Sequence, residues 1–215
     1  MISILKKIMS TGMATENYDT GEISNRFRGG VVIGDQECMG CQACIDLCPT
    51  KAIRSIKGSI HIDHNSCIFC GRCVKQCEKQ QLQHTNQYQL ATLAGSLGDN
   101  TGELIKRKIR SILGRSLHIR HVDVGSCNAC DFEMSALSNP IYDIQQYGID
   151  FVASPRHADL LMVTGVVTRN LTQALLMTYD AVPAPKIVMA VGACAASGQV
   201  FGPSYALRGA VATLV

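Results

Sequence analysis

The chain has 215 residues, room for one or two domains, with 47% hydrophobic residues, 17% charged residues and a formal net charge of +3. This is a globular composition, and its apolar runs are far too short to span a bilayer. Lys6 and Lys7 interrupt the N-terminal apolar run, so we expect no secretion signal. Eleven cysteines without an export signal indicate a reducing compartment and metal ligation, and the small net charge gives no argument for nucleic acid as a partner.

Residues 1–30 are expected to form an N-terminal docking segment. Apolar residues from Ile4 to Met9 recur at helical spacing beside Lys6 and Lys7, which predicts a short helix. This helix could pack on its own domain or on a partner, or it could rest on a membrane-side subunit. We favour the first, because a helix of about ten residues buries little apolar surface. The rest of the segment is polar and is expected to be an extended lead-in.

Residues 31–84 contain two cysteine runs with the same spacing, C-x2-C-x2-C-x3-C, one beginning at Cys38 and the other at Cys67. One wrapped loop can supply three thiolates to a cubane cluster, while the fourth cysteine has entered the next segment and serves the other cluster. The spacing is that of bacterial two-cluster ferredoxins and predicts an α+β, ferredoxin-like dicluster domain with two 4Fe-4S clusters. The expected ligands are Cys38, Cys41, Cys44 and Cys77 for cluster 1, and Cys67, Cys70, Cys73 and Cys48 for cluster 2.

Two other uses of cysteine compete with this interpretation. Zinc sites favour paired C-x2-C knuckles rather than a triplet followed by a fourth cysteine. A disulfide framework is typical of a small secreted chain. Both are therefore less favoured than iron–sulfur clusters.

Between the two runs, apolar residues alternate around Lys57 and Gly58, which predicts a small hairpin. The two runs are internal repeats, with one departure: Pro49 follows Cys48, whereas Glu78 follows Cys77. Since proline turns the chain, we expect the segment after Cys77 to be shaped differently.

Residues 85–115 are assigned to a linker and a basic helix. The Gln- and Gly-rich composition of residues 79–102 is typical of a linker. The following ELIKRKIRSILG places Ile105, Ile109 and Ile112 on one helical face. The basic residues of this helix could meet an acidic partner or lipid headgroups, but a solvated face is favoured.

Residues 116–215 alternate strand-like and helical patterns. The apolar runs LHIRHVDVG, IDFVAS, DLLMVTG and KIVMAVG are separated by NPIYDIQQYG and TRNLTQALLMTYD, which have helical periodicity. This alternation predicts an α/β domain with a parallel sheet covered on both faces. Ligands of such sheets bind beyond the carboxyl ends of the strands.

Three cysteines lie where this rule places a ligand site. Cys127 and Cys130 follow the first strand, and Cys194 follows the last. Their convergence predicts a third 4Fe-4S cluster, but no cysteine remains for a fourth ligand. A redox-active Cys127–Cys130 dithiol is the competing interpretation.

A family resemblance emerges at this point. The segments SLHIRHVDVGSCNACDFE, ASPRHADLLMVTGVVTRN and GACAASGQVF closely resemble the small subunit of energy-converting, group 4 NiFe hydrogenases of the formate hydrogenlyase type. They are more distantly similar to the 20 kDa subunit of respiratory complex I, where the first two cysteines are adjacent. The dicluster part resembles the ferredoxin-like subunit that accompanies this small subunit, so the chain resembles a fusion of the two.

The resemblance implies a flavodoxin-like fold for residues 116–215, incomplete at its C-terminal end. In the family the last ligand of the cluster comes from a G-C-P-P segment, and this chain reaches Val215 before any such segment. A third 4Fe-4S cluster on Cys127, Cys130 and Cys194 therefore needs a fourth ligand from elsewhere.

The resemblance also implies the function. We expect an iron–sulfur electron-transfer subunit without catalytic residues of its own, peripheral on the cytoplasmic face of the cell membrane, in a hydrogenase or formate hydrogenlyase-like complex. Its expected partners are a hydrogenase or complex I-like large subunit, membrane-arm subunits, and a soluble electron donor or acceptor. The alternatives are a subunit of a complex I-like quinone oxidoreductase without nickel, a dithiol oxidoreductase using Cys127 and Cys130, and a truncated paralogue that binds only two clusters.

Five further residues are candidates for a role at this site. Glu133 matches an acidic position that the family associates with proton movement, or it is a carboxylate in the first turn of a helix. Arg156 and His157 match the family pattern and could face the large subunit, but a hydrogen-bonded loop pair is favoured. Gly125 and Gly192 are expected to let the backbone approach the third cluster.

Overall fold

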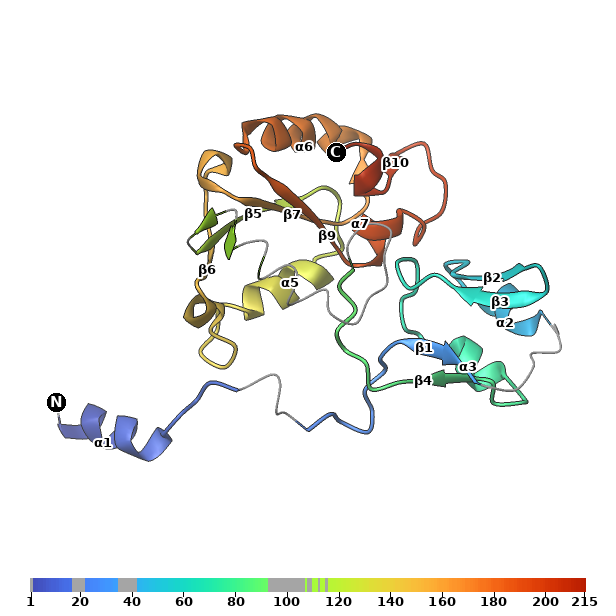
Figure 1. Cartoon of the computed structure of the whole chain (residues 1–215), viewed down its shortest axis with the longest axis horizontal. Helices are drawn as coiled ribbons and strands as arrows, with labels where there is room; N and C mark the ends of the chain where they lie inside the picture. Colours follow the sequence, from blue (N-terminus) through green and yellow to red (C-terminus); the bar gives the residue numbers. More distant parts are fainter. Residues whose placement is uncertain are drawn as a thin grey trace.

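The computed structural model describes residues 2–16, 22–34, 42–92, 107, 110–111, 113–114 and 116–215. Two bodies lie side by side, with helix α1 (Ile2–Thr11) standing apart from both (Figure 1). The helix predicted at the N-terminus is therefore confirmed. Cys38, Cys41 and most of the predicted basic helix lie outside the described residues.

The smaller body, the dicluster module, consists of two short antiparallel pairs and two five-residue helices. Strand β2 pairs with β3, and β1 pairs with β4. The predicted hairpin is confirmed, with its turn at Lys57 and Gly58, both at positive φ. The elements are β1 (Val31–Ile33), α2 (Ala43–Leu47), β2 (Ile53–Ile56), β3 (Ser59–Ile62), α3 (Arg72–Gln76) and β4 (Leu82–His84).

Strand β4 corrects the prediction that a linker begins at residue 79. Leu82 pairs with Ile33 and His84 pairs with Val31, so the chain returns to the module after the last cysteine. Leu82 is buried in the same cluster as Val31. A strand of three residues has too few positions for alternation to be recognised in a Gln-rich stretch.

The larger body is built on a four-stranded parallel sheet in the order β6-β5-β7-β9. This confirms the predicted parallel sheet. Its strands are β5 (Leu117–Asp123), β6 (Ile149–Phe151), β7 (Leu160–Thr164) and β9 (Ile187–Val191). Around it lie α5 (Ala129–Ala136), η1 (Ile144–Tyr147), η2 (Pro155–His157), β8 (Val167–Thr168), α6 (Arg169–Ala181), α7 (Ala193–Ser197), β10 (Leu207–Gly209) and η3 (Val211–Thr213).

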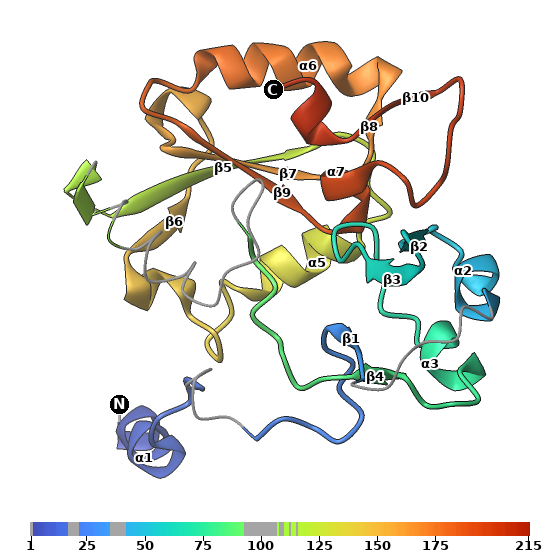
Figure 2. The ribbon, with the colours of Figure 1, turned by 45° about the vertical axis from the view of Figure 1, so that its right-hand side comes forward.

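Strand β7 is buried along its whole length because helices cover both faces of the sheet. Leu161 and Val163 point into a core that includes Leu175 of α6 and Ala195 of α7. Leu160 and Met162 point into the opposite core, which includes Met134 of α5. Helices α6 and α5 accordingly lie on opposite faces of the sheet (Figure 2).

Helix α6 confirms the helical prediction for TRNLTQALLMTYD, but the prediction for NPIYDIQQYG is wrong. The carboxamide oxygen of Asn139 accepts hydrogen bonds from the backbone N–H groups of Ile141 and Tyr142, both at 2.9 Å. Such a side-chain bond competes with helix formation. Only the 3-10 helix η1 forms in this segment, and the actual helix, α5, begins earlier, two residues after Cys127.

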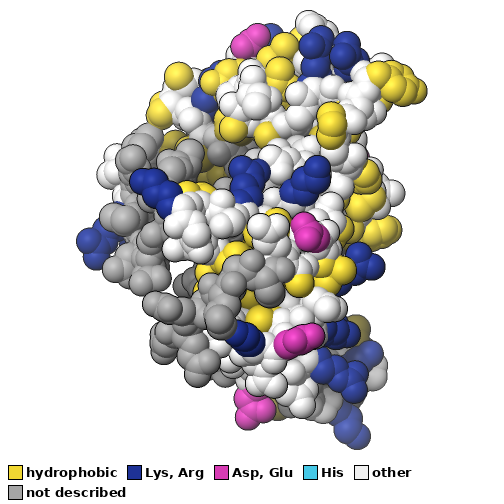
Figure 3. All heavy atoms as spheres, turned by 90° about the vertical axis from the view of Figure 1, so that its right-hand side faces the viewer, with side chains coloured by type: hydrophobic (Ala, Val, Ile, Leu, Met, Phe, Trp, Pro, Cys, Tyr) yellow, Lys and Arg dark blue, Asp and Glu magenta, His cyan; other side chains and the backbone are white. Residues whose placement is uncertain are grey.

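Two contacts connect these parts of the molecule. The backbone N–H of Glu16, just after α1, donates to the carbonyl oxygen of Ile141 at 2.9 Å. Arg54 of β2 reaches Gln199, just after α7, at 3.5 Å. Figure 3 shows Lys and Arg side chains spread over one face of the molecule, among hydrophobic ones, rather than gathered in a single patch. None of the described helices is both long enough and apolar enough to cross a bilayer.

Candidate metal centres

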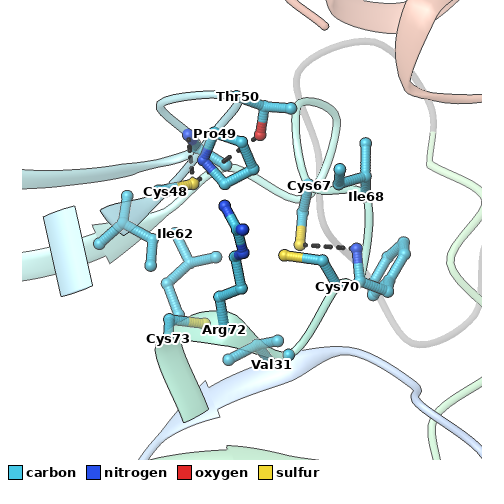
Figure 4. Close-up of a pocket in the computed structure, with 14 residues that line it drawn as sticks. Val31, Cys48, Pro49, Thr50, Ile62, Cys67, Ile68, Cys70, Arg72 and Cys73 are labelled. Carbon is cyan, nitrogen blue, oxygen red and sulfur yellow. Dashed lines mark hydrogen bonds between the residues drawn. The ribbon is translucent and has the colours of Figure 1, made fainter. Parts of the chain in front are cut away.

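Four cysteines of the dicluster module line one hollow of about 390 Å³. Cys67 and Cys70 come from the loop before α3, and Cys73 lies in that helix. Cys48 reaches the hollow from the other cysteine run (Figure 4). The structure therefore brings together the four cysteines that the sequence assigns to cluster 2.

Two thiols of this hollow, those of Cys67 and Cys73, have a raised pKa. Burial raises the pKa of Cys67, and the nearby Cys48 and Cys70 raise it further, although the backbone N–H of Phe69 donates to its sulfur at 3.4 Å. Burial likewise raises the pKa of Cys73. Because iron binds thiolates, loading this site must release protons.

A second hollow, of about 360 Å³, is lined by Cys44 and Cys77. Its other lining residues are mostly apolar and come from strands β1, β3 and β4, from helices α2 and α3, and from the turn before β4. These two cysteines belong to different runs, and the sequence assigns both to cluster 1. Cys38 and Cys41, the other two cysteines of that set, lie outside the described residues.

The turns that follow Cys48 and Cys77 have the same shape, which corrects the expectation based on Pro49. The backbone N–H of Ala52 donates to the sulfur of Cys48 at 3.3 Å, and that of Gln81 donates to the sulfur of Cys77 at 3.3 Å. Lys51 and Gln80, which come just before these donors, also adopt matching left-handed conformations. The fixed φ of proline is compatible with this turn but is not needed to form it.

One backbone feature recurs in all three cysteine motifs. In each motif the residue directly after one cysteine, Cys41, Cys70 or Cys127, is left-handed: Gln42, Gly71 and Asn128 have φ values of 55°, 72° and 66°. A short helix that contains the next cysteine starts immediately afterwards. The third motif thus folds locally like the first two.

The third site lies at the carboxyl edge of the parallel sheet. Burial raises the pKa of both Cys130 and Cys194, and the charge of Cys127 raises both further. The three thiols predicted to converge are therefore neighbours, and Cys127 is exposed to solvent. No group of three His, Cys, Asp or Glu side chains in the described part of the chain is close enough to hold a single metal ion.

The two glycines expected to lie close to this site differ in the atoms that surround them. Gly192 has a φ of +86°, and a Cβ atom there would lie 2.7 Å from the sulfur of Cys130. The backbone at Gly192 therefore comes as close to a cysteine as expected. Gly125 packs instead against Thr168 and the carbonyl oxygen of Val166, and these contacts are sufficient to require glycine there.

A carboxylate that the sequence analysis missed supports the Cys127–Cys130 loop. Asp131 accepts hydrogen bonds from Ser126 at 2.5 Å and from Thr164 at 2.9 Å. His121 Nε2 lies 3.1 Å from the same carboxylate and 2.8 Å from Thr164 Oγ1. Burial lowers the pKa of His121 despite the charge of Asp131. The available signal was the pair of polar residues, His121 and Thr164, on adjacent strands of the sheet.

Asp123 fixes the start of the same loop. Its carboxylate accepts from the backbone N–H groups of Gly125 and Ser126, both at 2.8 Å. Partial burial opposes ionisation, but these hydrogen bonds together hold the pKa of Asp123 below its ordinary value. An aspartate that binds the backbone two and three residues on is a familiar turn signal, and it was available in the sequence.

The remaining candidates lie away from the thiols or on the surface. Glu133 is exposed on α5, where its charge slightly raises the pKa of Cys130. Arg156 and His157 lie in η2, which precedes β7 and so lies at the opposite end of that strand from the cysteine edge. The structure does not bring them to the three cysteines.

Two family models match the chain. Residues 30–78 match the 4Fe-4S dicluster domain, and residues 127–213 match the family of the NADH ubiquinone oxidoreductase 20 Kd subunit. The first match contains all eight cysteines of the two runs, and the second contains Cys127, Cys130 and Cys194.

Curated relatives resemble part of the chain. A probable membrane-bound hydrogenase subunit of Pyrococcus furiosus is 48% identical over 89 residues, 41% of this chain and 53% of that protein. Formate hydrogenlyase subunit 7 of Escherichia coli is 36% identical over 124 residues, 58% of this chain and 47% of that protein. An NADH-quinone oxidoreductase subunit of Bacteroides thetaiotaomicron is 43% identical over 79 residues, 36% of this chain and 40% of that protein.

The chain spans about half the length of these relatives. A chain in the structure of a membrane-bound sulfane sulfur reductase, an archaeal respiratory complex, is 30% identical with a TM-score of 0.39, too low to equate the two folds. The match covers 50% of this chain and 57% of that chain. Residues 30–78 are thus similar to a 4Fe-4S dicluster domain, and residues 127–213 are similar to the family of the NADH ubiquinone oxidoreductase 20 Kd subunit.

Proposed function

We propose that this chain is an iron–sulfur electron-transfer subunit of a membrane-bound, energy-converting complex of the hydrogenase or formate hydrogenlyase type. The observation that carries the proposal is the hollow that four thiols line from two separate cysteine runs. Thiols standing around a cavity suit a cluster of several iron and sulfide ions, whereas zinc needs four ligands within about 2.3 Å of one point.

We assign the ligands as the cysteine runs indicate. Cluster 1 takes Cys38, Cys41, Cys44 and Cys77, and cluster 2 takes Cys67, Cys70, Cys73 and Cys48. The shared hollow of Cys44 and Cys77 supports the first set. The backbone donors to the sulfurs of Cys48, Cys67 and Cys77 would favour the more negative, reduced state of each cluster.

The third site would hold a further 4Fe-4S cluster on Cys127, Cys130 and Cys194, with a fourth ligand from outside the described set. The strand order β6-β5-β7-β9 agrees with the first four strands of a flavodoxin-like sheet. Such a sheet binds its ligand at the carboxyl edge, where these cysteines lie. The exposed Cys127 would face a large subunit that carries the catalytic centre.

Cluster 2 would be the neighbour of the third site. Arg54, two residues after the cavity-lining Ala52, contacts Gln199 beside α7, the helix that contains Cys194. Electrons would then pass between the third site, cluster 2 and cluster 1, and on to a soluble partner.

We assign residues 1–30 to docking, 31–84 to the two-cluster domain, 85–115 to the connection and 116–215 to the large-subunit side. Membrane-arm subunits would hold the complex on the cytoplasmic face of the membrane. The name of the Pyrococcus furiosus relative, a probable membrane-bound hydrogenase subunit, supports the association with a membrane. A complex I-like quinone oxidoreductase without nickel is the second candidate, because a subunit of NADH-quinone oxidoreductase is also similar.

A free-standing dithiol oxidoreductase is less well supported. A reactive dithiol needs a thiol with a lowered pKa. Burial instead raises the pKa of Cys130, and Cys127 raises it further. The position of Cys194 beside both is explained by a cluster and not by a dithiol.

The test uses the native complex, purified without oxygen. We expect hydrogen gas to produce the EPR signals of reduced 4Fe-4S clusters, and the Cys48→Ala variant to stop reduction of cluster 1. Reduction by dithionite but not by hydrogen would support the nickel-free candidate. A complex in which neither reductant produces a cluster signal would contradict the proposal.

A further inference from the structure

Helix α1 presents an uncovered apolar face. Its side chains from Ser3 to Thr11 are all exposed. Ile4, Leu5, Ile8 and Met9 are between 58% and 86% exposed, although hydrophobic residues of this size are usually buried. Both ribbon views show the helix away from the sheet and from the dicluster module (Figures 1 and 2).

The residues of α1 are sorted cleanly into two sides. At about 100° per residue, these four apolar side chains fall in one arc of about 140°. The opposite arc holds only polar residues: Ser3, Lys6, Lys7, Ser10 and Thr11. The hydroxyl groups of Ser10 and Thr11 donate to the carbonyl oxygen of Lys7, at 3.0 Å and 2.7 Å. The helix therefore has one purely apolar side and one side whose only charges are positive.

Further exposed apolar residues lie after α1 and on the larger body. Met13 is 90% exposed. The backbone hydrogen bond from Glu16 to Ile141 holds the end of the segment after α1 beside the loop that follows α5. Ile141 and Tyr142 of that loop are large apolar residues that are also exposed. Tyrosine is enriched at the level of lipid headgroups, where its ring and hydroxyl meet different surroundings.

We propose that α1 lies flat in the headgroup region of an anionic lipid bilayer. Ile4, Leu5, Ile8 and Met9 would enter the boundary with the acyl chains, and Lys6 and Lys7 would lie among the headgroup phosphates. Charge complementarity selects this occupant, because α1 contains two cations and no acidic residue.

The residue types of α1 fit lipid better than a protein partner. Protein interfaces are enriched in aromatic residues and arginine and depleted of lysine. Helix α1 has no aromatic residue and no arginine, and both of its charged residues are lysines. Long lysine side chains can extend to the headgroups while their methylene groups stay with the apolar side.

A helix of this length binds a membrane reversibly, so α1 would orient the chain on the surface without anchoring it permanently. The inference rests on α1 and the adjacent loop alone. It holds whether or not the proposal about electron transfer is correct, and iron content reports on the latter separately.

The test is sedimentation of the full chain, loaded with iron and sulfide, with vesicles of phosphatidylcholine alone or mixed with phosphatidylglycerol. We expect binding to the anionic vesicles that weakens as ionic strength rises from about 0.05 M to about 0.5 M. Ile8→Glu should weaken it roughly tenfold, because a carboxylate then faces the acyl chains.

Two control variants carry the same new charge. Ser10→Glu changes the polar side of α1 and should weaken binding much less than Ile8→Glu. Met177→Glu should have no effect, since Met177 is 63% exposed, the same as Ile8, but lies on α6. The proposal is overturned if the chain binds neither vesicle, if Ile8→Glu binds normally, or if Met177→Glu is equally impaired. Self-association without vesicles that Ile8→Glu abolishes would also overturn it, in favour of a second copy as occupant.

Discussion

The dicluster module and the sheet edge hold the same kind of cysteine motif in different surroundings. In the module, Cys44 and Cys73 are buried, and each hollow is completed by a cysteine from the other run. At the sheet edge, Cys127 is exposed and Cys130 and Cys194 are only partly buried. The module encloses its described cysteines, whereas the sheet edge leaves one of its three cysteines exposed to solvent.

The two regions also differ in what holds them together. The buried cluster of the module has only five members among the described residues, and two of them are Cys44 and Cys73. The sheet is covered by apolar cores on both faces, and neither core includes a cysteine from the described part of the chain. Metal binding should therefore be part of folding for the module but not for the sheet.

The largest expected effect follows directly from this contrast. Removing iron should unfold residues 42–92, with a loss of amide protection on the order of 100-fold, while β7 keeps its protection. Hydrogen exchange of the loaded and iron-free chains, read by mass spectrometry, measures this. Equal loss of amide protection in both regions would show that the module does not depend on iron for its folding more than the sheet does.

The next largest effect concerns the fourth ligand of each cluster, which we propose comes from the other cysteine run. Cys48→Ala should remove about four irons per chain and the signal of cluster 2, whereas Cys77→Ala should remove about as many and the signal of cluster 1. EPR of the two reduced variants distinguishes the signals. If each variant instead lost the cluster of its own run, the crossed pairing would be wrong.

Gly192→Ala should damage the sheet edge and leave the module intact. The new Cβ would lie 2.7 Å from the sulfur of Cys130, at a positive φ that alanine adopts only with strain. We expect loss of the third cluster and a destabilisation of about 1–3 kcal/mol. Gly202→Ala is the control, because it also has a positive φ but has no heavy atom within 4 Å of a new Cβ. Loss of the third cluster in both variants would mean that strain alone, and not contact with Cys130, is responsible.

Asp131→Asn should loosen the Cys127–Cys130 loop. The amide keeps one acceptor oxygen but no charge, so the bonds from Ser126 and Thr164 weaken, at a cost of about 1–2 kcal/mol. Urea unfolding of the sheet, monitored by circular dichroism, measures the change in the free energy of unfolding. Glu133→Gln removes the same charge from an exposed position on α5 and should change stability little. Similar losses of stability in both variants would show that the lost charge, rather than the weakened hydrogen bonds, causes the destabilisation.

The smallest effect concerns pH in the iron-free chain, where the sheet domain stays folded. The pKa values of Cys130 and Cys194 are raised in the fold, so these thiols stabilise it below the ordinary thiol pKa. This stabilisation is lost as pH rises through the raised pKa values. The urea midpoint of the sheet should therefore fall between about pH 7.5 and about pH 10, and fall less in a Cys130→Ser, Cys194→Ser double variant. An identical fall in both proteins would assign the effect to other groups.

The sequence predicted the parts of the fold that follow from a regular pattern. Cysteine spacing predicted which thiols would share a hollow, and β-branched runs predicted the four sheet strands because both faces are buried. Helix α5 was foreseen only as one of two explanations for Glu133, and its start was not predicted because the left-handed Asn128 and the surrounding polar residues hide it. Asp131 was missed for another reason: its role depends on Thr164 and His121, which only the sheet brings beside it.

The central claim is that these thiols hold iron–sulfur clusters, and counting iron and acid-labile sulfide in the chain purified without oxygen tests it most directly. The account predicts a brown protein with about 12 irons and about 12 sulfides per chain when the third site is complete, or about eight of each when only the module is loaded. A colourless protein that contains zinc, or no metal at all, would contradict it.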